Sequence, residues 1–82
     1  MHAARLSHSP RLRRVHALMR DGRERSTRDI VIGAHVCAVN SCIAELRAAP
    51  NNCRISCRQI VDPATGQRTW LYRMHPQKED LQ

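Results

Sequence analysis

Residues 26–48, STRDIVIGAHVCAVNSCIAELRA, form the stretch that decides the fold. The Thr27 hydroxyl can accept a hydrogen bond from a backbone N–H one turn further on, so we expect Thr27 to cap a short helix. Asp29 then lies in the first turn, where the helix dipole favours a carboxylate. A second apolar register follows with spacings of three, four and three residues: Val36, Val39, Ile43 and Leu46. This spacing predicts a second, longer helix that begins at Val36 after a tight turn.

The residues opposite that apolar stripe are small or polar: Cys37, Asn40, Ser41, Glu45 and Arg47. A capped helix, a turn and a helix with a small polar outer side make the helix-turn-helix pattern, whose second helix fits a DNA major groove. Asn40 can pair bidentately with adenine, and Ser41 can contact a base or a phosphate. Small side chains at the leading end allow close approach, which makes Cys37 and Ala38 further candidates for base contacts. The alternative is the solvated polar side of an ordinary helix.

The segment before this stretch predicts another helix. Ser9 and Pro10 form a helix-start signal. We expect this first helix over residues 10–21, where apolar residues recur on one side: Leu12, Val15, Leu18 and Met19. Gly22 is expected to end it, because glycine enters the left-handed conformation at low cost. A charged loop then follows up to Arg25.

The segment after it predicts a β-hairpin. A turn is expected at residues 50–52, and from Cys53 the apolar period changes to two, which is typical of a half-buried strand. The inner face of this strand is expected to hold Cys53, Ile55, Cys57 and Val61. Residues 62–66, DPATG, have hairpin-turn composition, and residues 67–74 form the return strand. One face of the return strand holds Arg68, Trp70, Tyr72 and Met74.

Together these elements predict an α+β fold, a three-helix winged helix-turn-helix with a C-terminal two-stranded β-hairpin as the wing. The domain is expected at residues 9–75, with a flexible basic arm at residues 1–8 and a polar tail at residues 76–82.

The 82-residue chain is strongly basic, with a formal net charge of +7 and a pI near 10.6. Thirteen of its fourteen basic residues are Arg. The guanidinium group binds phosphates and guanine edges, so double-stranded DNA is the expected partner. Alternatively, the high Arg content reflects a GC-rich genome, or the basic surface binds an acidic protein partner. The phosphate-contact candidates are Arg11, Arg13, Arg14, Arg25, Arg28, Arg47, Arg54, Arg58 and Arg68. The hairpin turn can place Arg68 or Gln67 in a minor groove, or it can be inert.

Other kinds of site have little support. Zinc sites use tight C-x2-C pairs, which the four cysteines lack, so we expect no metal and no cofactor. The cysteines are instead expected to be small buried or half-buried thiols: Cys37, Cys42, Cys53 and Cys57. We find no nucleophile constellation or Gly-rich phosphate loop, and expect no enzyme activity. His16 and His35 are expected to be structural, although His35 can also donate to a phosphate or a carbonyl.

No apolar run approaches the roughly 20 residues that span a bilayer, so no membrane association is expected. The N-terminal residues also lack the apolar core of a secretory signal. We therefore expect a cytoplasmic protein whose thiols are reduced.

Residues 36–47, VCAVNSCIAELR, followed by Ile55 and the closing Tyr72-Arg73-Met74, resemble the small helix-turn-helix proteins of phages and prophages. Those proteins have a central Ile and a Glu-Leu-Arg ending in the third helix, then a turn, a hairpin and a Tyr-Arg-apolar close. The chain departs from them at residues 50–52, where a Gly-centred turn is usual, and at His35, where Gly is frequent. The resemblance implies sequence-specific DNA binding by the third helix.

The sequence thus predicts a sequence-specific DNA-binding transcriptional regulator of phage or mobile-element type, with the third helix in the major groove and the Arg-rich first helix and the wing on phosphates. A thin core and the apolar Ile60 and Leu71 on an otherwise polar strand face suggest a homodimer. The alternative is a phage-encoded module that binds a host protein and inhibits a nucleic-acid machine, as an anti-CRISPR-like protein or a polymerase inhibitor would.

Overall fold

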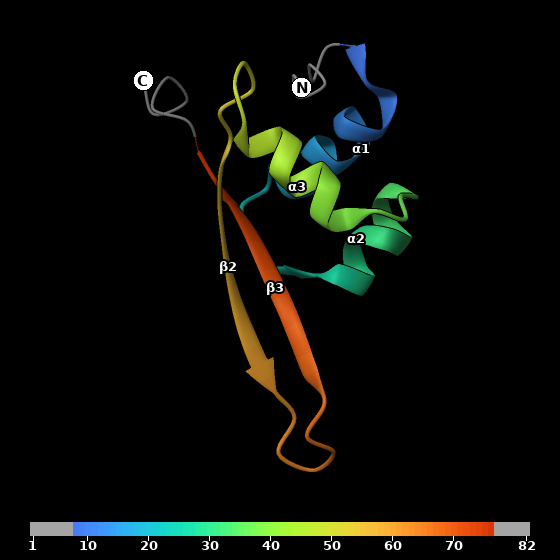
Figure 1. The fold of residues 1–82 in the computed structure, drawn as a ribbon, viewed down its shortest axis with the longest axis vertical. Helices are drawn as coiled ribbons and strands as arrows, with labels where there is room; N and C mark the ends of the chain where they lie inside the picture. The colour runs from blue at the N-terminus through green and yellow to red at the C-terminus, as the bar shows by residue number, and fades with distance from the viewer. Residues whose placement is uncertain (1–7, 77–82) are drawn as a thin grey trace.

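The computed structural model describes residues 8–76. It has the α+β class that the sequence predicts, with the helices α1, α2 and α3 and the strands β1, β2 and β3. The helices gather beside one end of a long hairpin, and the other end of the hairpin projects away from them (Figure 1). The predicted arm lies outside the described residues except for His8, and so does the predicted tail except for Pro76.

Helix α1 (Pro10–Met19) begins as predicted, with Ser9 as its cap and Pro10 in its first turn. The Ser9 hydroxyl accepts a hydrogen bond from the Leu12 backbone N–H at 3.4 Å. The helix ends at Met19, before the predicted residue 21, and Gly22 adopts the left-handed conformation with a φ of 79°. The predicted stripe is confirmed, because Leu12, Val15 and Met19 are buried and Leu18 packs against the core.

Helix α2 (Thr27–Ala34) is capped by Ser26, and the predicted cap Thr27 is its first residue. The Ser26 hydroxyl accepts from the Asp29 backbone N–H at 3.0 Å, and the Asp29 carboxylate accepts from the Ser26 N–H at 2.9 Å. This reciprocal capping box needs an acidic residue three positions after the cap. Asp29 lies three positions after Ser26, so Ser26 and not Thr27 is the cap.

Helix α3 (Val39–Arg47) starts three residues later than predicted, because the chain first makes a turn at residues 35–38. His35 ends α2 in the left-handed conformation, with a φ of 55°. The axes of α2 and α3 then lie 90° apart. Val36 therefore belongs to the turn, yet it is buried together with Val39, Ile43 and Leu46. The apolar spacing identified the buried residues correctly and misplaced the start of the helix.

The sheet has three antiparallel strands in the order β1-β3-β2, where a two-stranded hairpin was predicted. Strands β2 (Arg54–Val61) and β3 (Arg68–His75) pair along their whole length, from Arg54 opposite His75 to Val61 opposite Arg68. The additional strand β1 (Arg25–Ser26) pairs with Tyr72 and Leu71 of β3. The predicted charged loop therefore ends in a strand, which is too short to show an alternating pattern.

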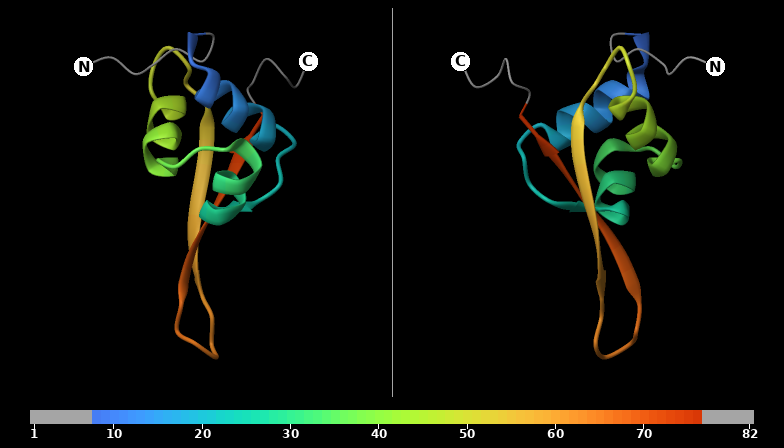
Figure 2. Two further views of the ribbon diagram at one scale, coloured as in Figure 1. Left: turned by 90° about the vertical axis from the view of Figure 1, so that its right-hand side faces the viewer. Right: turned by 60° about the vertical axis from the view of Figure 1, so that its left-hand side comes forward.

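The hairpin divides into two halves at the point where the pairing of β1 ends. Its packed half, residues 54–58 and 71–75, adds Ile55, Tyr72 and Met74 to the helical core. Its projecting half, residues 59–70, extends beyond the helices in all views (Figures 1 and 2). Cys57 and Val61, expected on the inner face, are exposed, and so is Trp70. The strands alternate as predicted, but the helical layer is too short to cover the inner face of the projecting half.

No single helix within residues 8–76 is long and apolar enough to cross a membrane. Only α2 and α3 taken together, across their 90° bend, reach the length and composition of a span. Ile30 of α2 and Val39 and Leu46 of α3 are buried in the common core, whereas Val31 and Ile32 of α2 are exposed.

Candidate nucleic-acid interface

The exposed side of α3 is made mainly of short side chains. Asn40, Ser41 and Ala44 are exposed there, and so is the longer Arg47. The Asn40 side-chain oxygen accepts a hydrogen bond from the Tyr72 hydroxyl at 2.9 Å, so one of its acceptor positions is occupied within the protein. Such a surface allows another molecule to approach the helix backbone closely.

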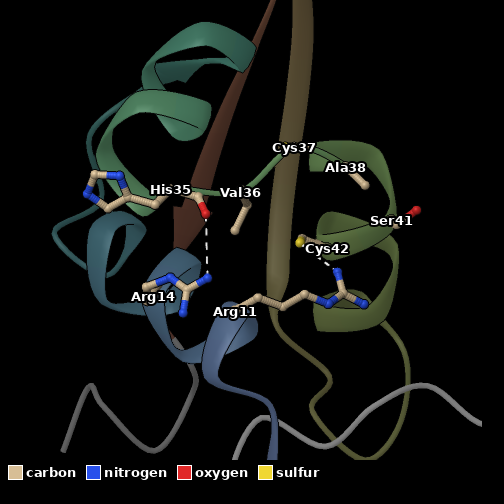
Figure 3. A pocket seen from close by; sticks show the side chains of 8 residues that line it. All are labelled: Arg11, Arg14, His35, Val36, Cys37, Ala38, Ser41 and Cys42. Carbon is tan, nitrogen blue, oxygen red and sulfur yellow. Dashed lines mark hydrogen bonds between the residues drawn. The ribbon is translucent and has the colours of Figure 1, made fainter.

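Cys37 and Ala38, two of the predicted base contacts, lie in the turn before α3 and not on the helix. They line a groove of about 400 Å³, called here the turn groove. Its lining residues are Arg11, Arg14, His35, Val36, Cys37, Ala38, Ser41 and Cys42 (Figure 3). The turn groove thus brings together three of the four predicted base contacts, and Asn40 lies outside it.

Two arginines fix the shape of the turn groove. Arg14 donates from Nε to the Ala34 carbonyl at 2.8 Å and from a terminal nitrogen to the His35 carbonyl at 3.5 Å, which holds the end of α2. Arg11 forms an ion pair with Glu45 at 2.6 Å. It also donates to the Cys42 sulfur at 2.9 Å, as Figure 3 shows. Glu45, the acidic residue of α3, is therefore neutralised by α1.

The start of α3 carries no side-chain cap from residues 8–76, because the cap position is Ala38. The first backbone N–H groups of a helix lack partners within the helix and point outward at the positive end of the helix dipole. This end opens beside the turn groove, where Arg14 adds positive charge, whereas the charge of Arg11 is balanced by Glu45. The geometry favours an anion at this place.

A second groove of about 350 Å³, called here the hairpin groove, lies between α3 and the sheet. Its lining residues are Asn40, Ile43, Ala44, Arg47, Cys57, Trp70 and Tyr72. Arg47, predicted to contact phosphate, donates from two nitrogens to the Ile55 carbonyl at 3.1 and 2.8 Å and ties α3 to β2. The exposed side of α3 therefore runs between two grooves.

The predicted phosphate contacts fall into two groups. The first group is bound within the protein and includes Arg11, Arg14 and Arg47, described above. It also includes Arg25, which pairs with Asp21 at 2.6 Å, and Arg58, which donates twice to Glu24, at 2.6 and 2.8 Å. Within residues 8–76, three candidates make no side-chain hydrogen bond or ion pair and are exposed: Arg28, Arg54 and Arg68. Arg13 is exposed on α1. Several predicted DNA contacts are thus also structural side chains.

The carboxylates that bind these arginines or backbone donors have shifted pKa values. The side-chain hydrogen bond from Arg58 lowers the pKa of Glu24, and the same bond raises the pKa of Arg58. The backbone N–H of Arg23 lowers the pKa of Asp21, and the backbone N–H of Ser26 lowers the pKa of Asp29. All three acids therefore stay ionised to a lower pH than an ordinary carboxyl group does.

The four cysteines are free thiols of two kinds. Cys42 and Cys53 are buried, as expected, and burial raises the pKa of Cys53. Cys37 and Cys57 are exposed, against the prediction, because the first lies in the turn and the second faces the hairpin groove. His35 is exposed, and its backbone carbonyl accepts the bond from Arg14.

No family model, curated protein or solved structure matches the chain. The site therefore rests on its own geometry. Sequence reasoning missed Ala44 and Trp70 as lining residues of an interface. Ala44 lies one turn beyond Asn40, so helical spacing could have placed it on the exposed side. Trp70 could not have been placed, because its exposure depends on where the helical layer ends.

Proposed function

We propose that the protein is a winged helix-turn-helix DNA-binding protein that inserts the exposed side of α3 into the major groove. The observation that carries this proposal is the bare, short-chained side of α3, which presents Asn40, Ser41 and Ala44 between two grooves that contain no unpaired acid. A recognition helix needs such a side, because base edges are reached only when the helix backbone comes close.

The arrangement of α2 and α3 supports the same function. Two helices at about 90° joined by a short turn are the geometry of helix-turn-helix motifs, and α2 and α3 lie 90° apart across residues 35–38. In this proposal the uncapped start of α3 meets a phosphate together with Arg11 and Arg14. The projecting half of the hairpin acts as the wing and brings Arg68 to the DNA backbone.

We further propose a role as a sequence-specific transcriptional regulator of phage or mobile-element type that acts as a homodimer. The exposed Ile60, 41% accessible, and the half-buried Leu71 support a dimer contact on the hairpin face that points away from α3. The two residues share that face because Arg58 pairs with Leu71 and Ile60 with Thr69. Sedimentation of the purified chain tests this part, and a monomer at every concentration would reject it.

A second candidate function is binding to an acidic host protein. The projecting half favours a protein partner, because a protrusion with the exposed apolar residues Ile60, Val61 and Trp70 also suits a protein interface. The net charge of +7 of the whole chain suits an acidic partner. In that case the chain binds a host nucleic-acid machine and not DNA itself. Absence of any binding to duplex DNA at low salt would favour this candidate over the first.

The test of the DNA-binding proposal is a charge reversal on α3 with a matched control. Ala44→Glu puts a carboxylate on the exposed side of α3 and is expected to weaken binding to a labelled duplex more than about tenfold, since like charges across an interface cost several kcal/mol. Ala17→Glu makes the same change on the exposed side of α1 and is expected to weaken it less than about threefold. Fluorescence anisotropy measures both, and equal effects would contradict the proposal.

A further inference from the structure

The hairpin groove contains an aromatic side chain that the proposed base contacts of α3 do not use. Trp70 is the single tryptophan of the chain, and 47% of it is exposed. Within residues 8–76 its indole makes no hydrogen bond. It lines the groove opposite α3, so an open aromatic surface lies beside the proposed recognition helix.

The chemistry around Trp70 suits a flat, hydrogen-bonding, anionic ligand. The groove is lined by the apolar Ile43, Ala44 and Cys57 and by the polar Asn40 and Arg47, and none of its lining residues is acidic. The groove therefore combines an aromatic surface with amide and guanidinium groups and an unopposed positive charge.

Additional groups lie next to the indole on the projecting half. Gln59 is directly opposite Trp70 in the strand register, on the same face of the hairpin. Arg68 precedes Trp70 by two positions, so it also shares this face, and it makes no side-chain ion pair inside the described part of the chain. A ligand that stacks on Trp70 thus lies beside the free guanidinium of Arg68, two residues away along the same face of β3.

We propose that the hairpin groove is a binding site for one unpaired nucleobase of DNA, which stacks on Trp70 while Arg68 holds a neighbouring phosphate. Unpaired bases are recognised by stacking on aromatic side chains and by hydrogen bonds to their edges. Besides their bonds to Tyr72 and Ile55, Asn40 and Arg47 each keep a side-chain nitrogen that can donate to a base edge. A paired base cannot offer its face to the indole. The inference rests on the proposed DNA binding and adds a preference for duplexes that contain an unpaired or readily opened base.

Trp70 fluorescence tests this site without any substitution, because the emission comes from one tryptophan. The probes are an intact duplex, the same duplex with one extra unpaired thymine, and the corresponding single strand. Stacking on a base quenches indole emission, so we expect strong quenching by the second and third probes and weak quenching by the intact duplex. Unchanged emission at saturating concentrations of the thymine-bulged duplex would overturn the proposal.

Two variants of Trp70 separate stacking from simple apolar contact. Wild type is expected to bind the bulged duplex about tenfold more tightly than the intact one, a typical contribution of one base–aromatic stack. Trp70→Leu should lose this preference and Trp70→Phe should keep most of it, while Thr69→Ala on the opposite hairpin face should leave it unchanged. Circular dichroism confirms that each variant is folded. A Trp70→Leu protein that keeps the full preference would contradict the site.

The outcomes distinguish this inference from the function on which it rests. If Ala44→Glu abolishes binding to intact duplex but Trp70→Leu leaves the bulge preference unchanged, the DNA-binding proposal stands and the base site is wrong. If polyglutamate quenches Trp70 and binds more tightly than all three DNA probes, the groove belongs to a protein partner and both proposals fail.

Discussion

The two halves of the hairpin carry similar alternating sequences but have different surroundings. In the packed half, Ile55, Tyr72 and Met74 are at most 8% exposed. In the projecting half, Val61 and Trp70 continue the same face and are 56% and 47% exposed. The difference shows that alternation determines which face of a strand turns inward, whereas the length of the helical layer determines how far that face is covered. Uncovered apolar residues beyond the layer are available to a partner.

The largest expected effect compares two apolar residues on the same face of β2, one in each half of the hairpin. Ile55→Ala removes a buried side chain from the core and is expected to destabilise the protein by about 2–4 kcal/mol. Val61→Ala, six positions further along the same face of β2, is expected to cost less than about 0.5 kcal/mol, because Val61 is 56% exposed. Urea unfolding followed by circular dichroism measures both values. Similar losses would show that the projecting half is packed in solution, for example within a dimer.

A smaller effect is expected from two arginines, one in each half of the hairpin. Arg68→Ala removes a free guanidinium of the projecting half and should reduce the magnitude of the log–log salt slope of DNA binding by about 0.9, the value for one phosphate contact. Arg58→Ala removes the same charge from the packed half, where Glu24 holds the guanidinium. Its effect on the slope should be much smaller. A larger change for Arg58→Ala would mean that the Glu24 pair opens on binding.

The smallest expected effect concerns acid stability at the junction where β1 meets the packed half. The Ser26 N–H lowers the pKa of Asp29 in the folded protein, so this carboxylate stabilises the fold above its ordinary value of 3.8 and loses that contribution as the pH falls through the lowered value. Asp29→Asn should therefore lower the melting temperature slightly at neutral pH and converge with wild type in acid. A difference that grows on acidification would contradict this assignment.

Much of the core could be predicted from spacing alone, because burial follows a periodic pattern. Leu12, Val15 and Met19 of α1 and Val39, Ile43 and Leu46 of α3 are buried as the sequence predicts. The start of α3 could not be predicted with the same certainty, since it depends on the left-handed conformation of His35, which sequence spacing does not indicate. Strand β1 contains only Arg25 and Ser26, and its pairing is decided by contacts across the chain.

The candidate site was predictable in part for the same reason. Helical spacing correctly predicted that Asn40 and Ser41 are exposed on α3. The roles of the arginines could not be separated, because whether a guanidinium is free or bound depends on partners distant in sequence, such as Glu24 for Arg58 and Glu45 for Arg11. Exposure of Trp70 likewise depends on the tertiary arrangement.

The central claim is that the leading end and exposed side of α3 face the duplex, and the native thiols allow a direct measurement. Cys37 is exposed in the turn before α3, whereas Cys42 and Cys53 are buried. Alkylation with iodoacetamide, followed by mass spectrometry, gives the rate at Cys37 with and without saturating duplex DNA. We expect duplex binding to slow alkylation of Cys37 strongly, by covering the turn groove. An unchanged rate at Cys37 in protein that is demonstrably bound to duplex would contradict the account.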